Sequence, residues 1–234
     1  MTRPSARPTN AQAALLPRVA ILDYGMGNLR SVEKALEHVG AQAPRTRDHE
    51  EVRRADGVIL PGVGAFPAAM KQVRRFGFDE LVRERLASRT PVLGICLGMQ
   101  LLFEHSEELG GAEGIGVLPG LVKRLDADSL KLPQIGWNSV SWRQSQETPS
   151  AAPPPLHHGL PDPCAFYHVH SFAARPGLAS DVLGIATYGG EFASAVERGP
   201  VSGVQFHPEK SGPHGLQLLQ NFVRVCAGER SMAA

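Results

Sequence analysis

One cysteine lies in a sequence context that suits a reactive thiol. Residues 91–95 form an apolar run that leads into Cys96, and a glycine stands two positions away on either side of this cysteine. Residues 97–105 are amphipathic, so the order predicts a strand, a sharp turn at the thiol and a helix. Glycines let neighbouring backbone approach such a turn, and the first amides of a helix favour a negative charge on the sulfur. We therefore expect a cysteine nucleophile at position 96.

A second segment supplies the proton-transfer groups that a cysteine nucleophile needs. An apolar strand ends at His207, and Pro208 stops the strand ladder. Residues i and i+2 of an extended chain project to the same side, so His207 and Glu209 are expected to face one site. The carboxylate would then orient the imidazole. In parallel α/β sheets the carboxyl ends of several strands meet, which lets this segment reach Cys96.

Two backbone segments are candidates for an oxyanion hole, which an attack on a carboxamide requires. The amide of Leu97, directly after the nucleophile, is one expected donor. The second is expected from the glycine loop 61–64, which contains Val63 and Gly64 and follows another apolar strand. Glycines in this loop permit a peptide orientation that β-branched neighbours resist.

The elements that would position these groups alternate between strands and helices. Strands are expected at residues 18–22, 57–60 and 91–95, short β-like runs at 120–124, 138–142, 165–172, 182–187, 193–197 and 201–205, and helices at 28–39, 78–88, 97–105 and 215–226. This order predicts an α/β fold: a central, mostly parallel sheet flanked by helices, with an additional smaller antiparallel β region.

The chain reads as one domain of residues 17–228. Residues 1–16 are rich in Pro, Ala, Arg, Ser and Thr and contain no acid, as a transit peptide can be, but they lack a clear basic amphipathic pattern. A disordered tail is the preferred interpretation, and residues 229–234 are expected to form a second tail. Residues 144–163 are expected to form a proline-rich surface loop.

Composition excludes several functional classes. The 234 residues are 42% hydrophobic and carry a net charge of +1, which gives no electrostatic reason to expect nucleic acid or a membrane as partner. No apolar run approaches the roughly 20 residues of a membrane span. Cys96, Cys164 and Cys226 are too far apart for a zinc pair, and His168 with His170 is a weak metal signal, so no metal and a reduced, cytoplasmic setting are expected.

Residues 94–100 together with 205–209 resemble the paired motifs of the class I (triad) glutamine amidotransferases. Other segments resemble one branch of that family, the glutaminase subunits of imidazole glycerol phosphate synthase. These segments are residues 23–32, 60–66, 131–138 and 207–211. The resemblance runs from about residue 18 to residue 227, with the proline-rich insertion outside it.

The resemblance implies a role for each group in the site. Cys96 would attack the side-chain amide of glutamine, His207 would move protons, and Glu209 would orient His207. Ammonia would leave, and water would release glutamate from a glutamyl thioester, without a cofactor. The oxyanion hole would comprise Val63, Gly64 and Leu97, and the glutamine would be held by Gly64, Gln100, Ser171 and Phe172.

The resemblance also implies a partner. Ammonia would pass to a separate (β/α)8-barrel cyclase subunit, which makes imidazole glycerol phosphate and aminoimidazole carboxamide ribonucleotide in histidine biosynthesis. Residues 23–28 are expected to form a tight turn that faces this partner. The lone subunit would have little activity, with the loop 61–64 as the candidate switch. Trp137, Asn138, Tyr167 and Lys210 match positions near the subunit interface, and His168 stands where the family commonly has an aromatic residue.

Two other hypotheses remain open from the sequence. The chain could serve another acceptor, as the amidotransferases for anthranilate, guanylate or pyridoxal phosphate do, but residues 23–29 and 136–138 argue against them. It could also be a non-catalytic binding module of the same fold. Loss of a triad residue would mark such a module, and all three residues are present.

Overall fold

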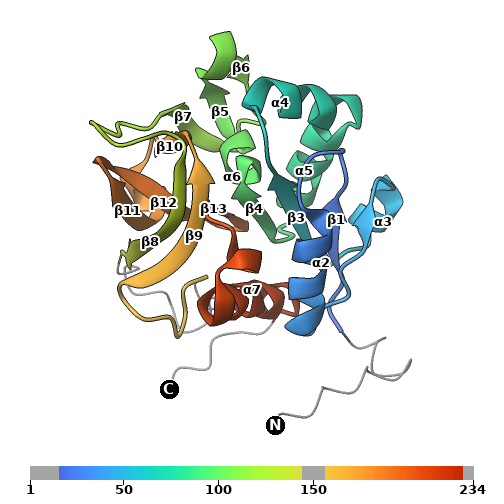
Figure 1. Ribbon diagram of the computed structural model, residues 1–234. Helices are drawn as coiled ribbons and strands as arrows, with labels where there is room; N and C mark the ends of the chain where they lie inside the picture. Colours follow the sequence, from blue (N-terminus) through green and yellow to red (C-terminus); the bar gives the residue numbers. More distant parts are fainter. Residues whose placement is uncertain (1–15, 144–155, 229–234) are drawn as a thin grey trace.

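The structure, a computed structural model, describes residues 16–143 and 156–228 and contains two sheets (Figure 1). Residues 1–15 of the expected tail 1–16, residues 144–155 of the expected loop 144–163 and the tail 229–234 lie outside the described residues. The large sheet has nine strands in the order β2-β1-β3-β4-β13-β12-β11-β8-β9, and the small one has four in the order β10-β7-β5-β6. The observed architecture agrees with the predicted α/β class, although antiparallel strands also complete the large sheet.

The bounds of the elements follow. The strands of the large sheet are β1 Val19–Leu22, β2 Arg45–Thr46, β3 Gly57–Gly62, β4 Val92–Cys96, β8 Gln134–Trp142, β9 Cys164–His170, β11 Val182–Tyr188, β12 Gly190–Arg198 and β13 Val201–Val204. Those of the small sheet are β5 Phe103–Ser106, β6 Ala112–Glu113, β7 Leu118–Arg124 and β10 Phe172–Pro176. The α-helices are α2 Leu29–His38, α3 His49–Arg53, α4 Phe66–Arg75, α5 Phe78–Ala87, α6 Leu97–Leu101 and α7 Gly212–Cys226. The short 3-10 helices are η1 Glu108–Gly110, η2 Ala179–Asp181 and η3 Pro208–Lys210.

Five neighbouring strands, from β2 to β13, pair in parallel and form the half of the large sheet that positions the nucleophile. Their side chains alternate between two apolar cores: in β1, Ile21 packs into one core and Leu22 into the other. Helices α2 and α7 lie side by side and supply the first core, whereas α4 and α5 supply the second (Figure 1). Both faces are covered, as a parallel sheet requires.

Two predicted elements differ from the structure. The helix predicted over 97–105 is wrong in its second half, because α6 ends at Leu101 and β5 begins at Phe103. The buried Phe103 pairs with Leu118 of β7, so sheet pairing overrides the helical pattern. The single run predicted at 165–172 is two strands, β9 and β10, which belong to different sheets.

Helix α4 was not predicted, although its sequence carries the usual signals. Pro67 lies in its first turn, and the buried Phe66, Met70 and Val73 follow helical spacing. Its first residue comes directly after the glycine loop 61–64 and Ala65, so α4 determines where that loop ends.

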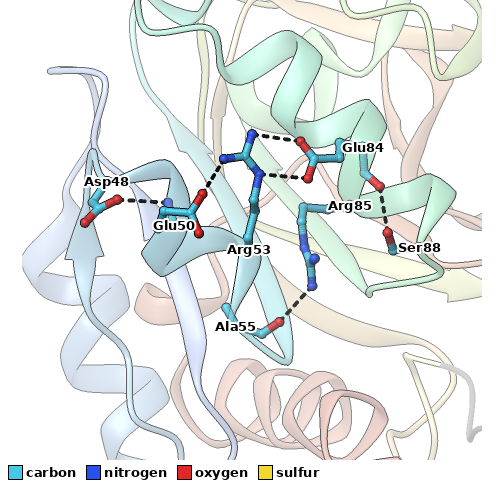
Figure 2. A network of polar contacts seen from close by, with 7 residues as sticks. All are labelled: Asp48, Glu50, Arg53, Ala55, Glu84, Arg85 and Ser88. Carbon is cyan, nitrogen blue, oxygen red and sulfur yellow. Dashed lines mark hydrogen bonds and ion pairs between the residues drawn. The ribbon is translucent and has the colours of Figure 1, made fainter.

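A network of polar side chains joins α3 to α5 on the surface (Figure 2). Arg53 forms a two-pronged ion pair with Glu84, at 2.8 and 3.0 Å, and a third contact with Glu50 at 2.8 Å. Asp48 caps α3 by accepting from the amide of Glu50. These side chains are largely exposed, so the network fixes geometry and contributes little stability.

The last part of the proline-rich segment, residues 156–163, packs against the domain. Leu156 is buried, and Asn221 of α7 donates hydrogen bonds to the carbonyls of Leu156 and His158. The indole of Trp142 donates to the carbonyl of Pro161. No helix among the residues that the structure describes is long and apolar enough to span a bilayer.

Candidate active site

The turn at Cys96 has the geometry of a nucleophile elbow. Cys96 has φ 54° and ψ −112°, a conformation that a non-glycine residue adopts only when its surroundings hold it there. The two flanking glycines are required by close packing. A Cβ on Gly98 would lie 1.7 Å from the carbonyl oxygen of Leu60, and one on Gly94 would lie 2.7 Å from the backbone of Met99. The elbow is therefore wedged between β3 and its own helix.

The structure brings His207 and Glu209 to this elbow. Strand β13 pairs in parallel with β4, with Val204 opposite Ile95, so the segment after β13 emerges beside Cys96. His207 Nδ1 lies 2.9 Å from Glu209 Oε1, and both side chains are at most 5% exposed. Because Nδ1 is engaged with Glu209, Nε2 is the ring nitrogen available to Cys96, which lines the same cavity.

The charge balance at His207 favours a protonated ring. Burial lowers its pKa, but hydrogen bonds and charge interactions with Cys96 and Glu209 outweigh burial and raise the pKa to about 9. An imidazolium next to a sulfur stabilises a thiolate, which is the reactive form of cysteine. The arrangement suits nucleophilic attack followed by proton delivery to a leaving group.

The glycine loop lies beside the nucleophile. Gly62 of β3 is directly opposite Cys96 of β4, and Val63 and Gly64 line the same cavity as the sulfur. Gly64 has φ +108°, a conformation that side chains rarely adopt. Leu97, the first residue of α6, also lines this cavity.

Tyr24 holds the base of this loop, a role that sequence reasoning missed. Its hydroxyl is buried and donates a hydrogen bond to the carbonyl of Pro61. Burial, together with the charge at Cys96, raises the pKa of Tyr24, so the phenol stays protonated as this bond requires. The turn 23–28, expected to face a partner, thus directs its tyrosine toward the interior.

A cavity of about 270 Å³ surrounds Cys96 and suits a ligand smaller than a typical drug. All four residues expected to hold glutamine line it: Gly64, Gln100, Ser171 and Phe172. The remaining lining residues are Val63, Cys96, Leu97, Glu108, Pro133, Val169, His170, His207 and Lys210. The sequence-based set therefore lies in one place, and the structure adds Glu108 to it.

Glu108 is the one carboxylate that lines the cavity within the described residues. Its Oε2 accepts a 2.8 Å hydrogen bond from the amide of Phe66, which starts α4. Glu108 belongs to η1, after β5, and reaches the site only because β5 pairs with β7. Several acids lie close together in residues 104–113, so the local sequence carries no signal that selects this one.

Gln100 presents a defined group to the cavity. Its Nε2 donates to the carbonyl of Phe172 at 2.8 Å and to Oε1 of Gln205 at 2.9 Å. These two bonds use both amide hydrogens, so the carbonyl oxygen is the part of the side chain left to receive a donor from a ligand.

Trp137, Tyr167 and Lys210, three of the four residues expected at an interface, lie together at the outer face of β8 and β9. Asn138 follows Trp137 in β8 and projects to the opposite face, because it is paired with the buried Phe166. Trp137 is 59% exposed and lies directly opposite Tyr167, with ring centroids 6.2 Å apart. Lys210 Nζ is 5.9 Å from the Tyr167 ring, and Asn138 donates to the carbonyl of Thr187. Ile135, 63% exposed on the same face, extends this surface. We call Ile135, Trp137, Tyr167 and Lys210 the β8–β9 face.

His168 and His170 are buried neutral side chains of β9, and His170 lines the cavity whereas His168 does not. Burial, reinforced for His168 by its neighbour His170, lowers their pKa values to about 3 and about 4. His168 Nε2 lies 2.8 Å from the Ser194 hydroxyl, which donates to it, and His170 Nδ1 donates to the carbonyl of Phe172. In residues 16–143 and 156–228 no three His, Cys, Asp or Glu side chains are arranged to hold a metal ion.

This chain is similar to known proteins in sequence and in fold. The family described as "Glutamine amidotransferase class-I" matches residues 20–226. The chain is 50% identical over 212 residues to "Imidazole glycerol phosphate synthase subunit HisH" of Pseudomonas putida, covering 88% of this chain and 96% of that protein. It is 48% identical over 214 residues to the protein of the same name from Bacillus cereus, covering 91% and 97%.

Solved structures agree on the fold. PurLQS from Thermotoga maritima aligns with a TM-score of 0.67 at 18% identity, over 90% of this chain and 99% of that one. The glutaminase domain of Trypanosoma brucei CTPS, solved with bound acivicin, aligns with a TM-score of 0.64 at 18% identity, over 93% and 96%. With the family match over nearly all of the described residues, these findings show that the chain belongs to the class I glutamine amidotransferases.

Proposed function

We propose that this chain is the glutaminase subunit of an imidazole glycerol phosphate synthase. It hydrolyses L-glutamine to glutamate and ammonia and supplies the ammonia to a (β/α)8-barrel cyclase subunit in histidine biosynthesis. The observation that carries the activity is the contact of a strained, buried Cys96 with the His207–Glu209 pair. The names of relatives at about 50% identity support this acceptor over those of anthranilate, guanylate or pyridoxal phosphate synthesis.

The reaction follows from the positions of these groups. The sulfur of Cys96 adds to the amide carbon of glutamine, and the negative charge on oxygen is received by the Leu97 amide and the Val63–Gly64 peptide. His207 passes the thiol proton to the nitrogen, the C–N bond breaks, and ammonia leaves a glutamyl thioester. Water, deprotonated by His207, then attacks that carbon, the C–S bond breaks, and glutamate leaves.

The cavity offers complementary groups for the rest of the substrate. The α-ammonium group of glutamine fits the carboxylate of Glu108 and the free carbonyl oxygen of Gln100. Gly64, Ser171 and Phe172 line the same cavity. The substrate would therefore be held at its amino-acid end while its amide points to Cys96.

The β8–β9 face is the proposed docking surface for the barrel. It exposes two large apolar side chains, Ile135 and Trp137, next to the cavity, because Ile135 lies opposite the cavity-lining Val169. The backbone carbonyl of Tyr167 accepts a 2.9 Å hydrogen bond from the His207 amide. A partner that moves Tyr167 would therefore also move the backbone of the triad residue His207. A peptide flip in the loop 61–64 would complete the oxyanion hole on docking. The three free cysteines fit a cytoplasmic location.

The activity can be tested with the assembled complex and one substitution. Cys96→Ala should abolish glutamate release, whereas binding to the barrel subunit should persist, because the thiol lies inside the cavity and not on the β8–β9 face. A glutamine-analogue electrophile should add one adduct to the wild-type protein at Cys96, as read by peptide mass spectrometry. Turnover that survives in Cys96→Ala would remove Cys96 from the mechanism.

A further inference from the structure

Two buried glutamine side chains form a chain that ends at the nucleophile. Gln100 lies on α6 and Gln205 directly after β13, and they are 4% and 0% exposed. Gln100 Nε2 donates to Gln205 Oε1 at 2.9 Å, and Gln205 Nε2 lies 3.8 Å from Cys96 Sγ. Gln205 belongs to the segment that carries His207 and Glu209, yet the proposed reaction gives it no task.

The orientation of both amides is determined by one carbonyl. The Phe172 carbonyl can only accept, so the Gln100 atom 2.8 Å from it must be the NH2 group. The second hydrogen of that group then points at Gln205 and requires an oxygen there. The NH2 group of Gln205 is consequently the end that faces the sulfur.

We infer that Gln205 donates a hydrogen bond to the reacting sulfur of Cys96, in an orientation that Gln100 fixes. This role rests on the proposed function in one respect, that Cys96 is the nucleophile. An N–H donor stabilises a thiolate more than a thiol, so Gln205 adds to the effect of His207.

The backbone carbonyl of Val169, which also lies near the sulfur, cannot take this role. The Val169 carbonyl lies 3.8 Å from Sγ and accepts from the thiol, so it favours the protonated form. Deprotonation removes that bond, whereas the contact from Gln205 becomes stronger as the sulfur gains charge. The two contacts therefore bias the thiol in opposite directions, and Gln205 opposes the bias of Val169.

The test removes the N–H donor of Gln205 and measures the reactivity of the Cys96 thiol across pH. Gln205→Met keeps a side chain of similar length without any N–H group. The rate of Cys96 alkylation by iodoacetamide, read by peptide mass spectrometry across pH, should shift its midpoint upward by about one pH unit. In the complex with the barrel subunit, kcat at neutral pH should fall about tenfold, with a smaller change in KM.

A matched control separates this effect from general loosening of the core. Asn221, also 0% exposed, donates to two backbone carbonyls next to α7, those of Leu156 and His158, and these contacts are remote from the Cys96 sulfur. Asn221→Leu should lower stability and leave the alkylation midpoint where it is. If Gln205→Met does not fold, Gln205→Asn keeps a buried amide and withdraws it from the sulfur, so the same upward shift is expected.

Each outcome has a defined meaning. A midpoint that stays unchanged in the Gln205 variants, or that shifts equally in Asn221→Leu, overturns the inference. If the variants still match wild type while Cys96→Ala is inactive, the inference fails and the proposed function stands. Failure of the proposed function is recognised separately, by a wild-type complex that releases no glutamate.

Discussion

At the scale of residues, the site depends on the buried pair His207 and Glu209, and the groups around His207 determine its protonation. His207 and Glu209 are within hydrogen-bond distance and almost fully buried. Removing either residue would therefore leave the other as an unpaired buried charge, which lowers the stability of the protein. In the proposed reaction Glu209 acts through His207 and is a positioning residue, whereas His207 exchanges protons with the reacting groups. The pair therefore links catalysis to stability.

Replacing the carboxylate should affect both properties. Glu209→Gln keeps an acceptor for His207 but removes the charge, so glutamate release by the complex should fall by about 10² to 10⁴-fold. The raised His207 pKa contributes stability that is complete below pH 6.5 and is lost as pH rises through about 9. Urea unfolding should show this decline in wild type and a smaller decline in Glu209→Gln. Equal declines would show that the carboxylate does not hold the imidazolium.

His168 should govern stability on the acid side. The pKa of His168 is lowered to about 3. The stability that its neutral ring contributes is therefore fully present above pH 6.5 and is lost progressively as pH falls from 6.5 toward 3. His168→Phe should weaken this dependence and cost about 1–3 kcal/mol, because the Ser194 hydroxyl loses its acceptor. The double variant His168→Phe/Ser194→Ala should recover most of the loss in urea unfolding. No recovery would mean that the cost comes from packing.

The sequence allowed some of these residues to be predicted. Cys96, His207 and Glu209 stand out because local chain geometry alone, an elbow and an i, i+2 pair, determines how they project. Glu108 and Gln205 are positioned by contacts between elements far apart in the chain, which no local pattern encodes. The sequence shows the residue types at these two positions, but it does not show which groups of other elements they contact.

At the scale of elements, the elbow depends on how closely β3, β4 and α6 approach. The two glycines beside Cys96 have no room for a side chain, since the nearest atoms are backbone atoms that cannot move aside. The strain at Cys96 is stored in this contact.

Adding one methyl group to the elbow should therefore be costly. Gly98→Ala should lower the free energy of unfolding by about 3 kcal/mol or more, because its Cβ would overlap the Leu60 carbonyl. Gly177→Ala is the matched control, since its nearest neighbour would be 3.3 Å away. Urea denaturation of both variants measures the difference. Similar costs at the two positions would contradict the close packing of the elbow.

The boundaries of helices and strands were predictable where the element buries one of its faces. They were less predictable where a strand pairs with a segment far away in the sequence. The closing helix predicted at 215–226 corresponds to α7, and the strand at 18–22 to β1. Residues 97–105 satisfy a helical pattern, yet β7 recruits Phe103 into a sheet. That pairing partner lies in another part of the chain, so amphipathicity alone gave the wrong end for α6.

At the scale of the whole molecule, the reactive cavity and the exposed β8–β9 face share one edge strand. β9 carries Tyr167 on the face and Val169 in the cavity wall, and it is hydrogen-bonded to the His207 segment. The network of α3 and α5 lies toward the opposite edge of the sheet (Figures 1 and 2). The proposed docking face and the reactive cavity therefore lie on the same side of the sheet.

Removing the main apolar side chain of that face should weaken assembly without unfolding the protein. Trp137→Ala should raise the Kd for the barrel subunit by about 30-fold, as expected for a buried aromatic anchor at an interface. Its free energy of unfolding should change little, because Trp137 is 59% exposed in the isolated chain. Arg53→Ala, on the surface network, is the control and should leave Kd unchanged. Titration calorimetry measures both values, and an unchanged Kd in Trp137→Ala would move the interface elsewhere.

Glutamate release by the purified wild-type chain, measured with and without the barrel cyclase and its nucleotide ligand, decides whether this chain is a partner-dependent glutaminase. Attack by Cys96 is proposed to depend on a loop and a triad segment that the partner touches, so the complex should release glutamate and the chain alone should release little. Complex formation without any glutamate release would contradict the central claim that this chain supplies ammonia to a bound cyclase.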